Sequence, residues 1–288
     1  MSGRYRVSPP RISPVATRAP KPPADASGSP GAYRQTTFVL SGDVECVLDG
    51  LNLEGSIADA SSGAKFRTQK MVAALGLWSR SWLSRLEALH AIEWGNYVAA
   101  ITLVRAAADY QASSLYVLRT DAAEWAEWLE GGGIALAPDQ HATEFRLHAF
   151  RAAEVLAAHD ILGPVYRTTM DLSLSHFGST LLVAGNESGP DRVLMTFGDR
   201  DFHLGLAELC LGWLAQLGMA QADALAEFGG VFAITDRPRL DTWRAGAGKL
   251  VDGTGRCRLE TIERDGEKRY LVHNWRREPR SAPKRLLL

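Results

Sequence analysis

The chain has 288 residues, of which 46% are hydrophobic and 23% are charged, and its formal net charge at pH 7 is −1. This composition is typical of a folded globular protein and excludes collagen-like and uniformly polybasic chains. No apolar run approaches the roughly 18 residues that a membrane-spanning helix needs, and the N-terminus has no apolar signal region. The three cysteines, Cys46, Cys210 and Cys257, are far apart. We therefore expect a reduced, cytoplasmic protein with no disulfide framework and no membrane association.

The first 34 residues have the composition of a disordered tail. Seven of the 13 prolines lie within the first 30 residues, and few large apolar side chains are present to offset the entropy of ordering. Residues 1–34 carry a net charge of +5 and residues 276–288 a net charge of +4. We expect residues 1–34 to form a basic, partly polyproline-like tail that is solvated or folds back on the acidic body. Both basic ends are candidate contacts for nucleic acid.

Residues 35–67 contain short apolar stretches interrupted by Gly42 and Gly50. This pattern predicts an irregular segment or one or two short strands. From residue 68 to residue 250 the apolar residues recur at helical spacing, which predicts a helical bundle.

The bundle contains several separate predicted helices. The segment 97–118 is apolar or small on nearly every face, as expected of a central, buried helix. Residues 192–198 are a candidate strand or extended connector, and residues 245–248 a candidate flexible connector. The predicted helices are 68–90 with Thr68 as N-cap, 97–118, 121–130, 138–159, one from Pro164 through Leu181, and one from Phe202 through Leu217.

The C-terminal segment 251–288 changes character. Asp265-Gly266 lies between two β-prone stretches and predicts a hairpin with a type I′ turn. We expect this hairpin to pack on the helices or to pair with a strand near residues 37–48, followed by a basic C-terminal tail. The turn fixes four favourable cross-strand pairs: Arg264 with Glu267, Glu263 with Lys268, Thr261 with Tyr270, and Leu259 with Val272.

The predicted fold is therefore mainly α-helical. It is a bundle of about five to seven helices, with a disordered N-terminal tail and a small C-terminal β-hairpin.

Polar residues inside apolar helices are the first candidates for a site. Arg105 and Asp109 are separated by one helical turn in the predicted central helix, Glu208 lies in a long uncharged stretch, and His176 follows Ser173 by three residues. Burying such groups without partners is costly. We expect Arg105, Asp109, His176 and Glu208 to form one polar network. Such a network either fixes the helix register or lines a ligand-binding or catalytic pocket.

Metal and cofactor motifs are weak or missing. Glu87 and His90 have the spacing of one half of a di-iron site, but no second half occurs. His141, Glu144 and His148 lie on a predicted solvent-facing helix. The sequence has no nucleophile elbow, P-loop or dinucleotide fingerprint. We therefore predict no metal site and no cofactor.

Two stretches, residues 95–119 and 166–181, resemble bacterial all-helical families of unknown function. In those families an arginine followed four residues later by an acid precedes a later helix with Ser-x-x-His. Their wider relatives resemble HEPN-like helical bundles (higher eukaryotes and prokaryotes nucleotide-binding), and the resemblance covers about residues 68–225. It implies a functional role for Arg105, Asp109, Ser173 and His176.

The same resemblance implies a candidate catalytic pair. HEPN ribonucleases carry an Arg-x(4–6)-His motif that acts at the scissile phosphate, and Arg85 and His90 have this spacing. The sequence departs from the family pattern because a leucine follows Arg85 and because the motif lies in an early helix.

Three functions stay open at this point. The first is a non-enzymatic helical scaffold or binding protein, which acts through a protein partner or self-association. The second is a HEPN-like ribonuclease or nucleotide-binding protein, and the third is a small-molecule pocket in the bundle without catalysis. The sequence favours the first, and the burial of the polar residues is expected to distinguish the three.

Overall fold

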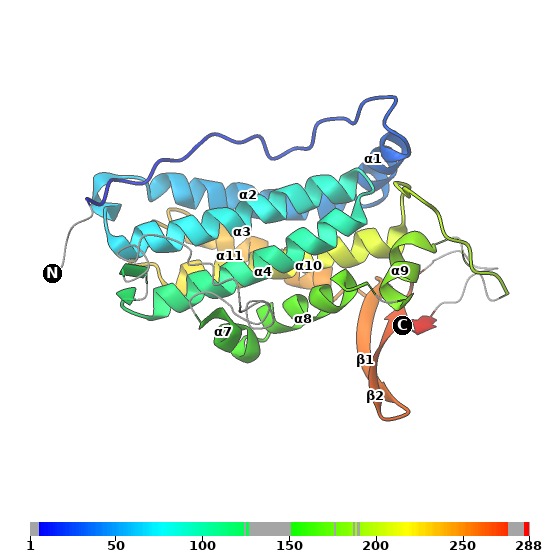
Figure 1. Ribbon diagram of the computed structural model, residues 1–288. Helices are drawn as coiled ribbons and strands as arrows, with labels where there is room; N and C mark the ends of the chain where they lie inside the picture. The colour runs from blue at the N-terminus through cyan, green and yellow to red at the C-terminus, as the bar shows by residue number, and fades with distance from the viewer. Residues whose placement is uncertain are drawn as a thin grey trace, which may run out of the picture.

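The structure is a computed structural model that describes residues 6–123, 125–126, 151–175, 177–186, 188, 191–275 and 285–287. This part of the chain is mainly α-helical with a small C-terminal sheet, as predicted (Figure 1). None of its helices is both long and apolar enough to cross a membrane. In chain order the elements are α1 (Ser29–Val39), α2 (Ser41–Ala60), the 3-10 helix η1 (Ala64–Phe66), α3 (Gln69–Glu93), α4 (Tyr97–Arg119), α7 (Ala152–Ala158), α8 (Leu162–Ser173), α9 (Phe177–Ala184), α10 (Leu204–Glu227), α11 (Arg237–Val251), β1 (Arg258–Arg264), β2 (Glu267–His273) and β3 (Arg285–Leu287).

The N-terminal region is more helical than its sequence predicts. Helix α1 begins at Ser29, inside the predicted tail 1–34, and has Pro30 in its first turn, where proline is tolerated. Residues 6–28 contain neither helix nor strand, in keeping with their proline content. The predicted boundary of the tail at residue 34 is therefore wrong.

The segment 35–67, predicted to be irregular or to form short strands, is helical over most of its length. Gly42 and Gly50 lower the helix propensity of α2. The helix nevertheless forms because it buries one complete face, which includes Val47 and Leu51. In proteins most helical stability comes from such packing and not from propensity.

Helices α3 and α4 form the most extensive helix pair of the bundle. Thr68 caps α3 as predicted, because its Oγ1 accepts a hydrogen bond from Met71 N at 3.0 Å. Asn96 caps α4 in the same way, through Ala99 N at 3.3 Å. Between the helices Gly95 adopts a φ of +70°, a conformation that glycine takes without strain.

Helix α10 is at the centre of the bundle and packs against α2, α3, α4, α8 and α11. Most of its residues are buried. The predicted central helix 97–118 corresponds to α4, and Val104 and Ala108 are fully buried there. Gln111 of α4 also donates a hydrogen bond to the backbone oxygen of Leu217 in α10, at 2.9 Å.

Two local predictions are corrected by the structure, and a third is narrowed to one of its alternatives. The helix expected from Pro164 through Leu181 is divided into α8 and α9, because Leu174 is extended and its carbonyl accepts a hydrogen bond from Ser179 Oγ at 2.5 Å. The flexible connector expected at residues 245–248 belongs to α11. Of the two alternatives for residues 192–198, a strand or a connector, the structure shows the connector, with a single bridge at Arg192. The predicted helices 121–130 and 138–159 lie largely outside the described residues, which include only α7 from the second of them.

The C-terminal hairpin has the predicted register, including all four expected pairs. Strand β3 adds to β2, and no strand forms near residues 37–48, because that segment is helical. Hydrogen bonds attach the hairpin and the residues before it to the bundle. The Glu208 carboxylate accepts a hydrogen bond from Cys257 N at 2.9 Å, and Tyr270 donates one to Asp171 at 2.5 Å.

Candidate ligand-binding site

Residues 6–20 form an extended segment, here called the strap, that lies along α2 and α3 (Figure 1). At its N-terminal end Arg67 Nε donates a hydrogen bond to the backbone oxygen of Val7. At its other end Thr17 contacts both helices: its hydroxyl bonds to Asn52 Oδ1 at 3.0 Å, and its carbonyl lies 3.0 Å from His90 Nε2.

The C-terminal end of the strap has two further attachments. Arg18 forms an ion pair with Glu45 at 2.9 Å. Trp94 Nε1 donates a hydrogen bond to the backbone oxygen of Pro20 at 3.1 Å. Between the two ends, residues 8–16 form no hydrogen bond with any residue that the structure describes. The strap is thus held at its ends and not in its middle.

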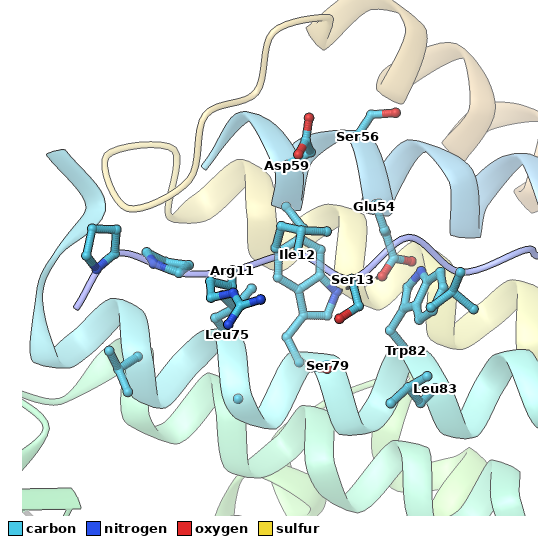
Figure 2. A pocket seen from close by; sticks show the side chains of 18 of the residues that line it. Arg11, Ile12, Ser13, Glu54, Ser56, Asp59, Leu75, Ser79, Trp82 and Leu83 are labelled. Atoms are coloured by element: carbon cyan, nitrogen blue, oxygen red, sulfur yellow. Dashed lines mark hydrogen bonds between the residues drawn. The ribbon is translucent and has the colours of Figure 1, made fainter. Parts of the chain in front are cut away.

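A cavity of about 1000 Å³ lies between the strap and the two helices. Figure 2 shows Ile12 and Ser13 of the strap passing between Asp59 on α2 and Ser79 on α3. Val15 and Leu83 also line the cavity. Ile12, Val15 and Leu83 are 36%, 46% and 42% exposed, so the strap leaves apolar surface uncovered inside the cavity.

One face of α3 supplies most of the apolar lining. Val72, Leu75, Trp78, Trp82 and Leu83 lie three or four residues apart or adjacent in sequence, and all of them line the cavity. Such spacing places side chains on one side of a helix. Trp78 is only 2% exposed, so the surface that this face offers to the cavity comes mainly from Val72, Leu75, Trp82 and Leu83. It is a largely apolar wall of the kind that small-molecule sites use.

Glu54 of α2 is the buried charged residue of the cavity lining. Its carboxylate accepts hydrogen bonds from both terminal nitrogens of Arg85, at 2.7 and 2.5 Å, and from Trp78 Nε1 at 2.8 Å. Glu54 and Arg85 are each only 2% exposed. A carboxylate paired and hydrogen-bonded in this way is stable when buried, but it has little capacity left to act as a base or to bind a ligand cation.

The predicted catalytic pair is not brought together. The Arg85 guanidinium points into the core toward Glu54, whereas the His90 ring bonds to the carbonyl of Thr17 in the strap. Five residues along a helix are about 140° apart around its axis, which explains the divergence. Neither residue lines the strap cavity.

Glu93 is a second buried acid near the C-terminal end of the strap. It is 4% exposed, and its Oε2 has no hydrogen-bond partner among the described residues. Burial raises the pKa of Glu93 to about 7, against the opposing charge of Arg18, and the nearby carboxylate of Glu45 adds to the rise. The structure therefore favours the protonated form of Glu93.

Arg105 and Asp109 lie together on α4 where it faces α8, but both are only half-buried. Arg105 Nη1 is 3.0 Å from the sulfur of Met170. Burial, together with the charge of Asp109, raises the pKa of Tyr166 on the same side of the bundle. The contact shown for Arg105 is therefore one with Met170 of α8, in a partly exposed part of the helix interface.

The other predicted members are elsewhere. Glu208 is buried and bonds to the backbone before β1, as described above. Ser173 is exposed, and its hydroxyl bonds to the carbonyl of Thr169 within its own helix. His176 lies outside the described residues. The structure thus divides the predicted set among different contacts.

The sequence reasoning missed the residues that form the cavity. The strap falls in the predicted tail, and Glu54 falls in the segment predicted to be irregular. The signal available was limited to the prolines of the strap, which favour an extended backbone, and the spacing of Trp78 and Trp82. Nothing in a single sequence places a tail over a particular helix face.

The described residues contain no group of three or more histidine, cysteine, aspartate or glutamate side chains arranged to hold a metal ion. Within the same residues all three cysteines are free thiols. Comparison of the chain with protein-family models, with curated proteins and with solved structures found no match.

Proposed function

We propose that this chain is a non-enzymatic binding protein that holds a small, mainly apolar molecule between the strap and helices α2 and α3. The observation that supports the proposal is the cavity of about 1000 Å³, whose wall on α3 is mainly apolar. Small-molecule sites generally have volumes of about 300–1000 Å³ and combine apolar walls with a few polar groups.

The rigidity of the helices and the looseness of the strap both fit a binding role. Helices α2 and α3 are fixed in the bundle by the buried Glu54–Arg85 pair, so one wall of the cavity is preformed. The other wall is the strap, whose central residues 8–16 form no hydrogen bonds with the described part of the chain that would resist movement. A ligand therefore has a way in that does not require the bundle to open.

The polar groups of the cavity favour binding over catalysis. The Glu54 carboxylate is already paired with Arg85, and Trp78 donates to the same group. Acid–base catalysis by a carboxylate requires that it can exchange a proton with the substrate, and nucleophilic catalysis requires a free oxygen. A carboxylate with three donors in a structural pair serves to hold the helices together.

Binding of a neutral fluorescent probe, N-phenyl-1-naphthylamine, tests the proposal. Ser79→Phe places a ring in the cavity from an exposed position of α3. Thr102→Phe adds the same ring at an exposed position of α4 away from the cavity. We expect the unaltered protein and Thr102→Phe to bind the probe alike, and Ser79→Phe to bind it at least about tenfold more weakly. Equal binding by Ser79→Phe, or no binding by the unaltered protein, would contradict the proposal.

A further inference from the structure

The strap cavity is long as well as large. On α3 its lining extends from Gln69 to Leu83, which at 1.5 Å per residue corresponds to roughly 21 Å along the helix axis. On α2 it extends from Leu51 to Asp59. This shape fits an elongated molecule better than a compact one.

The two halves of the cavity differ in charge. Arg6 lines the N-terminal end of the strap, where Arg67 is bonded to Val7, and Arg11 lines the cavity five residues further along, near the middle of the strap. Neither Arg6 nor Arg11 forms an ion pair with the residues that the structure describes. The lining of the other half contains no arginine or lysine and consists of apolar groups such as Val15 and Leu83 with the polar Thr17 and Asn52.

The acidic groups of the lining do not cancel this positive half. Glu54 is neutralised by Arg85, which lies behind it in the core. Asp59 is exposed on α2, whereas Arg11 lies beside Leu75 of α3 on the other side of the strap (Figure 2). A ligand in the cavity therefore meets two arginines without a described partner and one solvated carboxylate.

We infer that the ligand is an anionic amphiphile, a molecule with an elongated apolar body and a carboxylate at one end. The body lies along the face of α3 that contains Val72, Leu75 and Leu83, and the carboxylate lies in the half of the cavity that Arg6 and Arg11 line. Arginine binds carboxylates well because its planar guanidinium offers paired donors. This inference rests on the proposed function, because it names the chemical class held by the same cavity.

A matched pair of fluorescent probes tests the class, with each probe kept below the concentration at which it forms micelles. The pair is cis-parinaric acid, which is anionic, and its methyl ester, which has the same chain without the charge. We expect the unaltered protein to bind the acid at least about tenfold more tightly than the ester. In a double variant, Arg6→Gln with Arg11→Gln, the affinity for the acid should fall to that for the ester, and the affinity for the ester should not change.

A control with the same loss of charge is Arg34→Gln with Lys249→Gln, since both positions are exposed and neither lines the cavity. This control should keep the preference for the acid. Equal binding of acid and ester by the unaltered protein would overturn the inference and leave the binding function intact. Binding of neither probe, nor of N-phenyl-1-naphthylamine, would overturn the binding function itself. A preference for the acid that persists in the Arg6 and Arg11 variant would overturn the assignment of the carboxylate to these arginines.

Discussion

Arg85 of α3 and Glu54 of α2 form a two-point ion pair in which both side chains are almost completely removed from solvent. The two residues are 31 positions apart in the chain, so the pair joins two different helices. Trp78 adds a third hydrogen bond to the same carboxylate. Removing one member of such a pair leaves the other as an uncompensated buried charge, whereas removing both does not. The pair therefore fixes how α2 lies against α3, and with it the wall of the cavity.

Glu54→Gln should lower the free energy of unfolding by about 3–5 kcal/mol, because Arg85 then remains charged in the core. A double variant, Glu54→Gln with Arg85→Met, should recover at least half of that loss. Urea-induced unfolding measures both. Glu227→Gln, which breaks the exposed pair with Arg119, is the control and should cost less than about 1 kcal/mol. Equal costs for Glu54→Gln and Glu227→Gln would show that the Glu54 pair is not buried in solution.

Asp109→Ala should have a much smaller effect than Glu54→Gln. Arg105 is only half-buried, and its Nη1 keeps its contact with the sulfur of Met170 when Asp109 is removed. We expect a change of about 1 kcal/mol in the free energy of unfolding. A loss of several kcal/mol in the same urea experiment would mean that Arg105 and Asp109 belong to a fully buried network after all.

Gly50→Ala should destabilise the protein although alanine favours helices. An added Cβ at Gly50 would lie 2.3 Å from the ring of Trp243, whose Nε1 is bonded to the backbone oxygen of Cys46 at 2.8 Å. Overpacking of this kind costs about 1–3 kcal/mol. Gly55→Ala on the same helix meets nothing within 4 Å and should be neutral or stabilising by up to about 1 kcal/mol. Thermal unfolding followed by circular dichroism compares the stabilities of the two variants. A Gly50→Ala variant more stable than Gly55→Ala would be inconsistent with the position of α11 on α2.

Stability should fall as the pH rises through 7 because of Glu93. Its folded pKa of about 7 lies above that of an unfolded glutamate, about 4.3. Below about pH 4 both states hold the proton, and the contribution of Glu93 is present in full. Between the two pKa values the folded state alone keeps the proton, so the free energy of unfolding decreases with pH, by about 4 kcal/mol when the change is complete above pH 7.

Glu93→Gln isolates this contribution. Urea unfolding at several pH values between about 4 and 8 should show a shallower pH dependence for the variant than for the unaltered protein. The difference between the two curves removes the contribution of the groups that titrate in both proteins. Curves that stay parallel throughout would show that Glu93 is not protonated in the folded protein near neutral pH.

Removing residues 1–34 should lower the thermal midpoint by about 5 °C or more. The deletion removes half of α1, including the buried Ser29 and Ala32, and it removes the hydrogen bond from Ser29 Oγ to Trp94 O at 2.9 Å. Removing only residues 1–16 should change the midpoint little, because residues 8–16 form no hydrogen bonds with the described part of the chain. Calorimetry of both shortened proteins measures this. Equal thermal midpoints for the two shortened proteins would show that α1 does not contribute to the core.

The parts of the fold that the sequence predicts correctly are those determined by neighbouring residues. Thr68 marks the start of α3 because capping depends on atoms three residues away. Asp265-Gly266 fixes the hairpin register because a two-residue turn leaves one way to pair the strands. The helical period from residue 97 to residue 118 is likewise a local pattern.

Only the tertiary structure decides that α2 is a helix and that the strap lies over it. The glycines of α2 have low helix propensity, and the burial that compensates for them comes from distant residues such as Trp243. The ion pair of Glu54 with Arg85 depends on the packing of two helices, and the cavity depends on where the strap comes to rest. Local propensities are sums over a few adjacent residues. These contacts exist only once segments far apart in the chain have packed together, so no pattern within either segment specifies the contacts.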